Sequence, residues 1–235
     1  MRGWQSAITV KGVRIEAFYH RYHCTAEPER IAGEILSRPE GVENIEEFFA
    51  SLSWEESMQI LEWQLRVKET LSVACKAHCS LNVHNSVLVS GPQRAALTAL
   101  IADHSSPMTL EFTETFPMPA TEISNGFLRD IHDLGHTTAL DDYGSGLNSR
   151  TLLTDFDFDI IKIDRSLVLE LDTSVEMQHE LQRVAEVLAG LGKGHVIEGV
   201  ETIEVFDILE SAGFTTFQGF LFLPPIPVSE MLDGL

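Results

Sequence analysis

The sequence predicts an α/β protein whose strands close into a barrel. Three observations lead to this fold class: short apolar runs alternate with helical segments, a β-rich hairpin opens the chain, and the predicted strands number eight. Alternating strands and helices are typical of a parallel sheet with right-handed crossovers, and eight strands close a (β/α)8 barrel. An open doubly wound sheet shows the same alternation, so it stays open as the alternative.

The first twenty residues predict a β-hairpin. Residues 4–10 and 13–19 are rich in β-forming side chains, and Lys11-Gly12 separates them. Two residues that end in glycine are typical of a tight hairpin turn, so the two strands are expected to run antiparallel.

Helices are predicted within residues 30–71. Apolar side chains fall near one helical face over several turns: Ile45, Phe48, Phe49, Met58, Leu61, Leu65 and Leu71. Ser53 stands before Trp54-Glu55-Glu56, and a serine followed three positions later by glutamate is typical of a helix N-terminus. We expect two or three helices here.

The remainder of the chain alternates between strands and helices. Strands are predicted at residues 80–83, 108–112, 137–140, 160–163, 195–197 and 215–217, and helices near residues 92–103, 120–134, 174–191 and 202–212. With the hairpin, these six runs make eight strands. No linker, low-complexity stretch or internal repeat interrupts the pattern, so a single domain over residues 1–235 is expected.

Composition limits the classes of function. The net charge of −20 argues against binding a DNA or RNA polymer, because clustered Lys and Arg hold phosphate backbones. Bound metal ions can still reverse the local sign for one phosphate compound. No run of about 18 uncharged apolar residues indicates a membrane segment, and the start lacks a secretory signal, so a cytoplasmic location is expected. The three cysteines, Cys24, Cys75 and Cys79, favour reduced thiols.

Polar side chains follow the predicted strands where each one ends. They are Glu16 on the second hairpin strand, and Asn82, Glu111, Asp141, Asp142, Lys162 and Glu198 on later ones. The C-terminal strand ends of an α/β barrel form one mouth, so these side chains are expected to converge. Asp141 and Asp142 would point to opposite sides of an extended chain, and a bend at residues 143–146 could let both reach the site.

Converging carboxylates of this kind are expected to hold cations. Two like unit charges 4 Å apart cost about 4 kcal/mol at an effective dielectric near 20. Either the pKa values rise until some groups are neutral, or cations keep the groups ionised. Carboxylate and amide oxygens are hard ligands that suit Mg²⁺ or Mn²⁺. Two such ions about 3.5 to 4 Å apart suit phosphodiester cleavage, so a metal-dependent phosphodiester hydrolase is predicted.

At these residues the sequence resembles the EAL-domain family of bacterial cyclic-di-GMP phosphodiesterases. The stretches that carry the resemblance are Glu16-Ala17-Phe18, LNVHNS around Asn82, LEFTE at 110–114, DDYGSGLNS at 141–149, DFDIIKIDRSLV at 157–168, IEGVET at 197–202 and FQGFLF at 217–222. The combination of DDYGSG, IKIDRS and EGVET is highly specific. The resemblance implies a modified TIM-like (β/α)8 barrel with one antiparallel strand, which agrees with the hairpin, and hydrolysis of cyclic-di-GMP to linear pGpG.

The resemblance also implies roles for single residues. The ligands of one Mg²⁺ or Mn²⁺ ion would be Glu16, Asn82, Glu111 and Asp141, and those of a second ion Asp141, Asp142 and Glu198. Lys162 would contact the attacking water or the phosphate, Glu114 would anchor the DDYGSG loop, and Glu201 would support Glu198. The residues expected on the substrate side are Gln5, His20, Arg21 and Gln218. A homodimer is implied, and a regulatory domain or protein partner is a further expectation.

The sequence departs from the family pattern near the first motif. The family usually has arginine four residues after the motif glutamate, where it binds substrate phosphate, and here His20 stands in that place with Arg21 beside it. A neutral imidazole lacks the bidentate contact of arginine, and Arg21 should face the opposite side of the strand. The alternative interpretation is a catalytically weak or inactive EAL-like protein that senses cyclic-di-GMP or binds a partner. The full set of acids and the lysine favour the enzyme.

Overall fold

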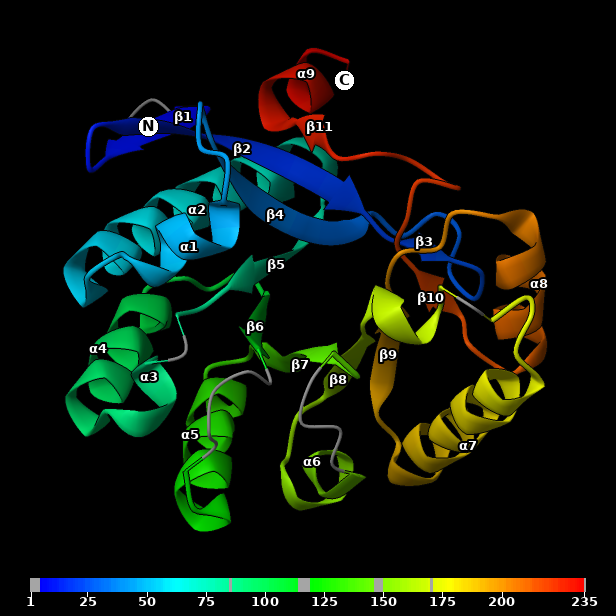
Figure 1. Ribbon diagram of the computed structural model, residues 1–235. Helices are drawn as coiled ribbons and strands as arrows, with labels where there is room; N and C mark the ends of the chain where they lie inside the picture. Colours follow the sequence, from blue (N-terminus) through cyan, green and yellow to red (C-terminus); the bar gives the residue numbers. More distant parts are fainter. Residues whose placement is uncertain (1–4, 85, 114–118, 146–149, 170, 235) are drawn as a thin grey trace.

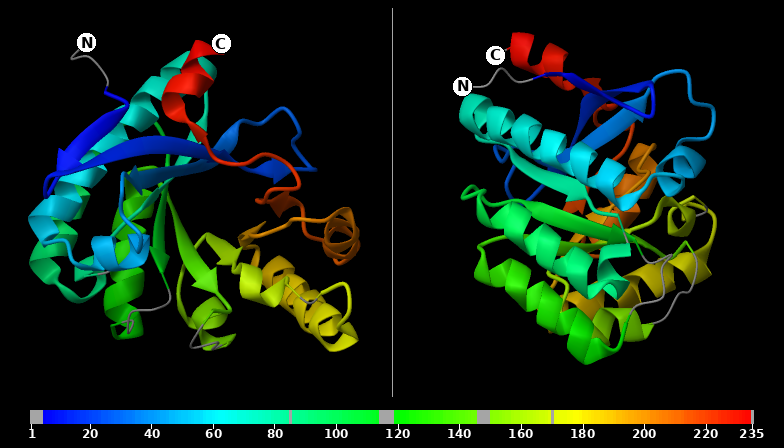
Figure 2. Two further views of the ribbon diagram at one scale, coloured as in Figure 1. Left: turned by 45° about the horizontal axis from the view of Figure 1, so that its top comes forward. Right: turned by 90° about the vertical axis from the view of Figure 1, so that its left-hand side faces the viewer.

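The strands of this computed structural model form one sheet that closes into a barrel, with the longer helices outside it (Figures 1 and 2). The structure describes residues 5–84, 86–113, 119–145, 150–169 and 171–234. The strands are β1 (Ala7–Val10), β2 (Val13–Arg21), β3 (His23–Cys24), β4 (Ala32–Pro39), β5 (His78–Asn82), β6 (Thr109–Thr113), β7 (Thr137–Tyr143), β8 (Ile160–Ile163), β9 (Gly194–Ile197), β10 (Thr216–Phe217) and β11 (Ile226–Pro227).

Closure of the barrel depends on the second strand and its continuation. β2 pairs antiparallel with β4, and each strand from β4 to β10 pairs in parallel with the next. β3 follows β2 after a single residue and pairs antiparallel with β10, which joins the two ends of the sheet. The predicted barrel with one antiparallel strand is therefore confirmed, and the open doubly wound sheet is excluded.

The predicted hairpin is present at the start of the described chain. β1 pairs antiparallel with β2 in a register that places Val10 opposite Val13. Lys11 and Gly12 both have positive φ angles, 50° and 78°. This is the backbone of a type I′ turn, whose twist matches that of the flanking strands and whose second position favours glycine. β1 lies at the outer edge of β2 and is not one of the barrel strands.

β4 is a barrel strand that was not predicted, because the sequence pattern assigned its residues to the helical region. Its residues AGEILSRP show no alternation of apolar and polar side chains, because the strand is buried on both faces in its first half. Ile35 and Glu34 are both buried although they point to opposite sides of the strand. The prediction of helix for residues 32–39 is wrong. Because of this error, Glu34 was not predicted to be a site residue.

The helices predicted after residue 44 are present, with small differences at their ends. The helices are α1 (Ile45–Ala50), α2 (Trp54–Cys75), α3 (Ser86–Val89), α4 (Gly91–Ala102), α5 (Thr121–Asp133), α6 (Arg150–Asp155), α7 (Val175–Leu191), α8 (Ile203–Ser211) and α9 (Val228–Asp233). Among these helices of the described residues, the short ones α3, α6 and α9 were not predicted. Ser53 caps α2 as predicted: its side chain accepts from the backbone N–H of Glu56, whose carboxylate accepts from the Ser53 N–H at 2.8 Å.

The main apolar core lies between the barrel and its helices. Trp63, Leu65 and Leu71 of α2 are buried against the sheet. Within the described ranges, no helix combines the length and the hydrophobicity that a bilayer crossing requires. Cys24, Cys75 and Cys79 are free thiols.

Candidate metal and phosphate site

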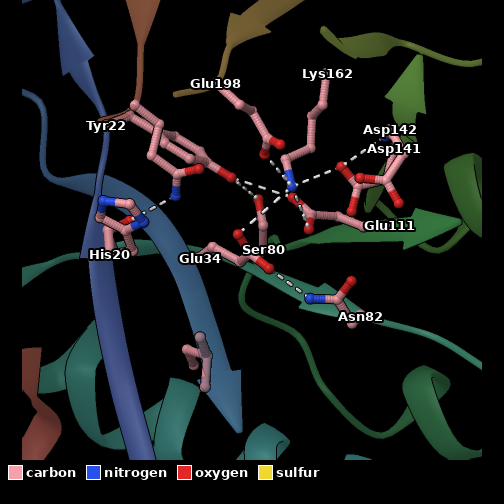
Figure 3. Close-up of polar contacts among 12 residues, drawn as sticks. His20, Tyr22, Glu34, Ser80, Asn82, Glu111, Asp141, Asp142, Lys162 and Glu198 are labelled. Carbon is pink, nitrogen blue, oxygen red and sulfur yellow. Dashed lines mark hydrogen bonds and ion pairs between the residues drawn. The ribbon is translucent and has the colours of Figure 1, made fainter. Parts of the chain in front are cut away.

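Charged side chains and one amide, from six neighbouring strands or their ends, meet inside the C-terminal mouth of the barrel (Figure 3). They are Glu34 on β4, Asn82 on β5, Glu111 on β6, Asp141 and Asp142 on β7, Lys162 on β8 and Glu198 immediately after β9. The convergence predicted for Asn82, Glu111, Asp141, Asp142, Lys162 and Glu198 is therefore present in the structure. It follows from the parallel register of β4 to β9, which brings the ends of the strands together.

Lys162 is the centre of this cluster. Its Nζ lies 2.8 Å from Asp141 Oδ1, 2.9 Å from Glu198 Oε1 and 3.0 Å from Glu111 Oε2. Glu34 Oε2 is a fourth neighbour at 3.5 Å. The lysine side chain is only 2% exposed, so the ammonium group is held almost wholly by carboxylates.

The glutamate that reaches the cluster from the β2–β4 pair is Glu34, and the prediction that Glu16 reaches it is wrong. Glu34 is 6% exposed, and its Oε1 accepts a hydrogen bond from Asn82 Nδ2 at 2.5 Å. In the antiparallel pairing of β2 with β4, Glu34 lies opposite His20, whereas Glu16 lies opposite Arg38. Four strand residues correspond to about 13 Å, so Glu16 is well removed from the cluster. Its carboxylate instead lies 3.6 Å from Arg14 Nη1.

Placing the motif at Glu34 also supplies the arginine that was missing four residues after Glu16. The triplet Glu34-Ile35-Leu36 is followed by Arg38, four residues after the glutamate. The family pattern of glutamate, leucine two residues on and arginine four residues on is therefore complete on β4. The interpretation that His20 replaces this arginine is wrong, because it depended on Glu16.

The two adjacent aspartates reach the same site because the backbone between them is bent. Asp142 has a φ angle of 59°, in the left-handed region, and the register between β7 and β8 shifts between Leu140 and Tyr143. This irregularity removes the strict alternation of a strand, so one oxygen each of Asp141, Asp142 and Glu198 can lie within 4.8 Å of one another. The bend occurs at Asp142 itself, before the loop in which it was expected.

The cluster has too many negative charges for its one lysine. Burial raises the pKa of Asp142 to about 7 and that of Glu198 to about 8, and the Asp141 charge adds to both effects. Burial also raises the pKa of Glu111 and of Asp141, although Lys162 opposes the shift. For Glu34 the balance is reversed, because Lys162 and the Asn82 amide outweigh burial and lower the pKa.

The donor set fits hard divalent cations. Five carboxylates and the amide oxygen of Asn82 are oxygen ligands of the type that Mg²⁺ and Mn²⁺ prefer, and the raised pKa values indicate that Lys162 alone does not neutralise the acids. Asp141, Asp142 and Glu198 are the residues that can close around one ion. Sulfur ligands are not among these residues, which argues against a zinc-type centre.

A hollow of about 220 Å³ lies beside the carboxylates on the open side of the barrel. The residues that line it include His20, Arg38, Arg165, Glu198, Glu201 and Gln218. Gln218 is 4% exposed and its Nε2 donates to the His20 carbonyl at 3.4 Å. His20 and Gln218 line this hollow, and their contact with substrate stays a prediction. Glu201 lies 3.8 Å from Arg165 Nη2, and its support of Glu198 likewise stays a prediction.

The remaining predicted site residues lie elsewhere. Gln5 is exposed, and its carbonyl accepts from the Trp63 indole at 2.8 Å on the outside of the barrel, so the prediction that it contacts substrate is not supported by its position. Arg21 faces away from His20, as strand geometry requires, and lines a separate hollow with Phe222 and Leu223. Glu114 lies outside the described residues.

Three further residues belong to the site but were not found from the sequence. Arg38 and Glu34 were hidden by the helical assignment of their strand. Tyr22 is buried, and its hydroxyl lies 3.1 Å from Glu111 Oε1 and 3.2 Å from Ser80 Oγ. No local pattern marks Tyr22, since its position depends on the chain continuing inward from β2 to β3.

Glycine shapes the edge of the site directly after Glu198. Gly199 has a φ angle of 68°, and a Cβ at this position would lie 2.3 Å from the Cβ of Arg165. A larger residue would therefore be strained in its backbone and would push back the segment that carries Arg165. The glycine lets the end of β9 pass close to the segment after β8, beside the hollow that Arg38 lines.

Comparison with known proteins identifies the family to which this arrangement corresponds. A family model described as the EAL domain matches residues 27–225, which begins after Glu16 and includes Glu34. The chain is 30% identical over 159 residues to the cyclic di-GMP phosphodiesterase PdeL of Escherichia coli, covering 66% of this chain and 44% of that protein. It is 33% identical over 159 residues to the cyclic di-GMP phosphodiesterase RocR of Pseudomonas aeruginosa, covering 66% and 40%.

A solved structure gives the same result for the fold. The BlrP1 protein of Klebsiella pneumoniae, solved as a manganese and cyclic-di-GMP complex, superposes with a TM-score of 0.78 at 25% sequence identity. The superposition covers 95% of this chain and 58% of that one. The match spans less than half of the length of the two curated relatives named above.

Proposed function

Because this chain belongs to the EAL domain family, we propose that it is a metal-dependent phosphodiesterase that hydrolyses cyclic-di-GMP to linear pGpG. The observation that carries the proposal is the set of four carboxylates around the buried ammonium of Lys162, with Asp142 close to two of them and a hollow lined by Arg38 alongside. The relatives named as cyclic di-GMP phosphodiesterases indicate the substrate. The BlrP1 structures of Klebsiella pneumoniae, solved with manganese or calcium and cyclic-di-GMP, indicate the type of cofactor.

We divide the ligands between two Mg²⁺ or Mn²⁺ ions. Glu34, Asn82, Glu111 and Asp141 would hold one ion, with Glu34 in the place first given to Glu16. The second would be held by Asp141, Asp142 and Glu198, whose oxygens already lie close together. Bound ions of this kind lower the pKa of water and polarise phosphate oxygens.

Lys162 and Arg38 would offset the negative charge of the substrate phosphate. Lys162 is buried among the acids that face the reacting phosphate, and burial in this setting makes its positive charge effective against developing negative charge. Arg38 lines the adjacent hollow, where a guanidinium group can make a bidentate contact with phosphate oxygens. The two cations would therefore act on different parts of the same anion.

A second cavity next to Arg38 has the character of a site for a planar base. It has a volume of about 330 Å³, and its wall includes Phe49 and Trp54 together with Asn82 and His84. Aromatic and apolar walls with a few polar groups are typical of pockets for small organic ligands. We place one guanine of the substrate here, with the phosphate towards Arg38.

The alternative function, an inactive sensor of cyclic-di-GMP, is not favoured by the described site. It rested on the absence of the phosphate-binding arginine, and Arg38 fills that place. The expected homodimer, the regulatory domain or partner, the single-domain organisation and the cytoplasmic location remain predictions from the sequence.

Turnover by the purified chain tests the proposal directly. We expect pGpG to appear by chromatography when the chain is incubated with cyclic-di-GMP and Mn²⁺ or Mg²⁺, and to be absent when a chelator is present. Lys162→Met serves as the matched inactive control, because it keeps the length of the side chain and removes the charge. Binding of cyclic-di-GMP with no pGpG from the wild-type chain, in either metal, would reject the enzyme and leave the sensor.

A further inference from the structure

We propose that Tyr22 is a positioning residue that fixes the carboxylate of Glu111 for metal binding. This inference deepens the proposed function, since it rests on Glu111 being a metal ligand. It comes from a hydrogen-bonded chain of three buried side chains, Ser80, Tyr22 and Glu111, at the inner wall of the barrel (Figure 3).

The backbone places the Tyr22 side chain inside the barrel. The Tyr22 N–H donates to the Ala32 carbonyl at 2.8 Å, which continues the β2–β4 ladder beyond the end of β2. Side chains two residues apart on a strand share a face, so Tyr22 lies on the same inner face as His20. The side chain is 8% exposed, and its hydroxyl reaches Glu111 across the barrel.

The direction of each hydrogen bond can be assigned from the number of hydrogens available. A carboxylate that binds a metal ion is ionised and only accepts, and a tyrosine hydroxyl has a single hydrogen. With Glu111 as a metal ligand, Tyr22 therefore donates to Glu111 Oε1 at 3.1 Å, and the Ser80 hydroxyl, 3.2 Å away, donates to the tyrosine oxygen. Ser80 thus holds the tyrosine oxygen in place, and the tyrosine holds the carboxylate.

Each oxygen of Glu111 consequently has its own partner. Oε1 is held by Tyr22, and Oε2 lies 3.0 Å from Lys162 Nζ. These two contacts come from opposite ends of the carboxylate, so together they fix the plane in which Glu111 presents its lone pairs. Groups that hold a metal ligand in this way contribute to metal affinity without touching the metal.

The space beneath Glu111 makes this contact necessary. A cavity of about 280 Å³ occupies the N-terminal half of the barrel, and Tyr22, Glu111 and Lys162 all line it. The remaining wall mixes small residues such as Ala32 and Ala139 with larger ones such as His78 and Ile160. Because Glu111 borders this open space, its carboxylate could turn towards the cavity if the Tyr22 hydroxyl were absent.

The test removes only the hydroxyl, by Tyr22→Phe, and measures Mn²⁺ binding by calorimetry in the absence of substrate. We expect affinity for at least one ion to fall about 10- to 100-fold, the usual effect of losing a group that holds a metal ligand. In the turnover assay kcat should fall at saturating substrate while KM for cyclic-di-GMP stays within about twofold, because Tyr22 is not among the residues that line the substrate hollow.

Tyr19→Phe is the matched control. Tyr19 lies on the same strand and is also buried, but its hydroxyl donates to the His78 carbonyl at 3.3 Å and not to a site residue. This variant should keep wild-type Mn²⁺ affinity and kcat, even if its melting temperature drops slightly.

Equal Mn²⁺ affinity and equal kcat in Tyr22→Phe and wild type would overturn the inference while leaving the phosphodiesterase intact. Weakened Mn²⁺ binding in a chain that forms no pGpG would uphold the positioning role and reject the proposed enzyme. A similar loss in both tyrosine variants would assign the effect to packing and also overturn the inference.

Discussion

Replacement of Glu34 by glutamine is the sharpest test of where the first metal ligand lies. Glu34→Gln keeps the size of the side chain and removes its charge. Opposite unit charges 3.5 Å apart, the separation of Glu34 Oε2 and Lys162 Nζ, interact by about 5 kcal/mol at an effective dielectric near 20. A divalent ion carries twice the charge of the lysine, so its attraction to a liganding carboxylate is larger still. Desolvation of the carboxylate offsets part of this attraction, so we expect loss of the liganding charge to cost at least about 4 kcal/mol.

This cost corresponds to a fall of about a thousandfold in kcat/KM, because each 1.36 kcal/mol is a factor of ten. Initial rates of pGpG formation at low cyclic-di-GMP, in the Mn²⁺ concentration that just saturates the wild-type chain, provide the measurement. The metal-free variant should melt at a lower temperature than the wild-type chain but still in one cooperative transition, because Lys162 and the Asn82 amide stabilise the Glu34 charge in the folded state. This second measurement separates loss of a ligand from loss of the fold.

Glu16→Gln is the matched control on the neighbouring strand. The Glu16 side chain is 25% exposed and pairs only with Arg14 in the described contacts, and such partly exposed pairs contribute about 1 kcal/mol or less. We expect its turnover to stay within about twofold of wild type. If Glu16→Gln lost activity and Glu34→Gln kept it, our assignment of the motif to β4 would be refuted.

Two further predictions concern the substrate contact and the charge of the site. Arg38→Lys should raise KM for cyclic-di-GMP about tenfold or more with a smaller change in kcat, because lysine cannot make the bidentate contact; an unchanged KM would remove Arg38 from the phosphate site. Burial gives Asp142 a pKa of about 7 and Glu198 one of about 8, so the folded state binds protons that the unfolded chain releases. The melting temperature of the metal-free protein should therefore fall as pH rises from 7.0 to about 8.5, and added Mn²⁺ should raise it more at the higher pH; a rise with pH in the metal-free protein would contradict this sign.

The fold was predictable to the extent that its elements carry their own local signal. The Lys11-Gly12 turn and the Ser53 cap are determined by short-range chemistry, and both appear in the structure as expected. The later strands were found because each is a short apolar run between helices. The predicted number of eight equals the number of barrel strands in the described chain only because two errors cancel: it included β1 and omitted β4.

The site was predictable wherever a polar or charged residue followed an apolar run on a parallel strand. Asn82, Lys162 and Glu198 were located in this way, and the structure brings them together. Glu34 was missed for a physical reason: β4 is buried on both faces, so its glutamate belongs to the barrel interior and interrupts the apolar pattern that would identify a strand. The similar triplet at Glu16 on β2 was therefore assigned to the motif, although the motif lies on β4, the antiparallel neighbour of β2.

The buried position of Glu34 explains why the sequence pattern did not identify β4. The same burial of acids also favours cation binding. A strand with a buried glutamate is unfavourable in an apolar core, and here the charge is tolerated because Lys162 and Asn82 lie against it. Four carboxylates within 3.5 Å of one lysine still leave an excess of negative charge that the protein alone does not neutralise. Cation binding should therefore stabilise the fold as well as enable the chemistry, because the same repulsion acts on both.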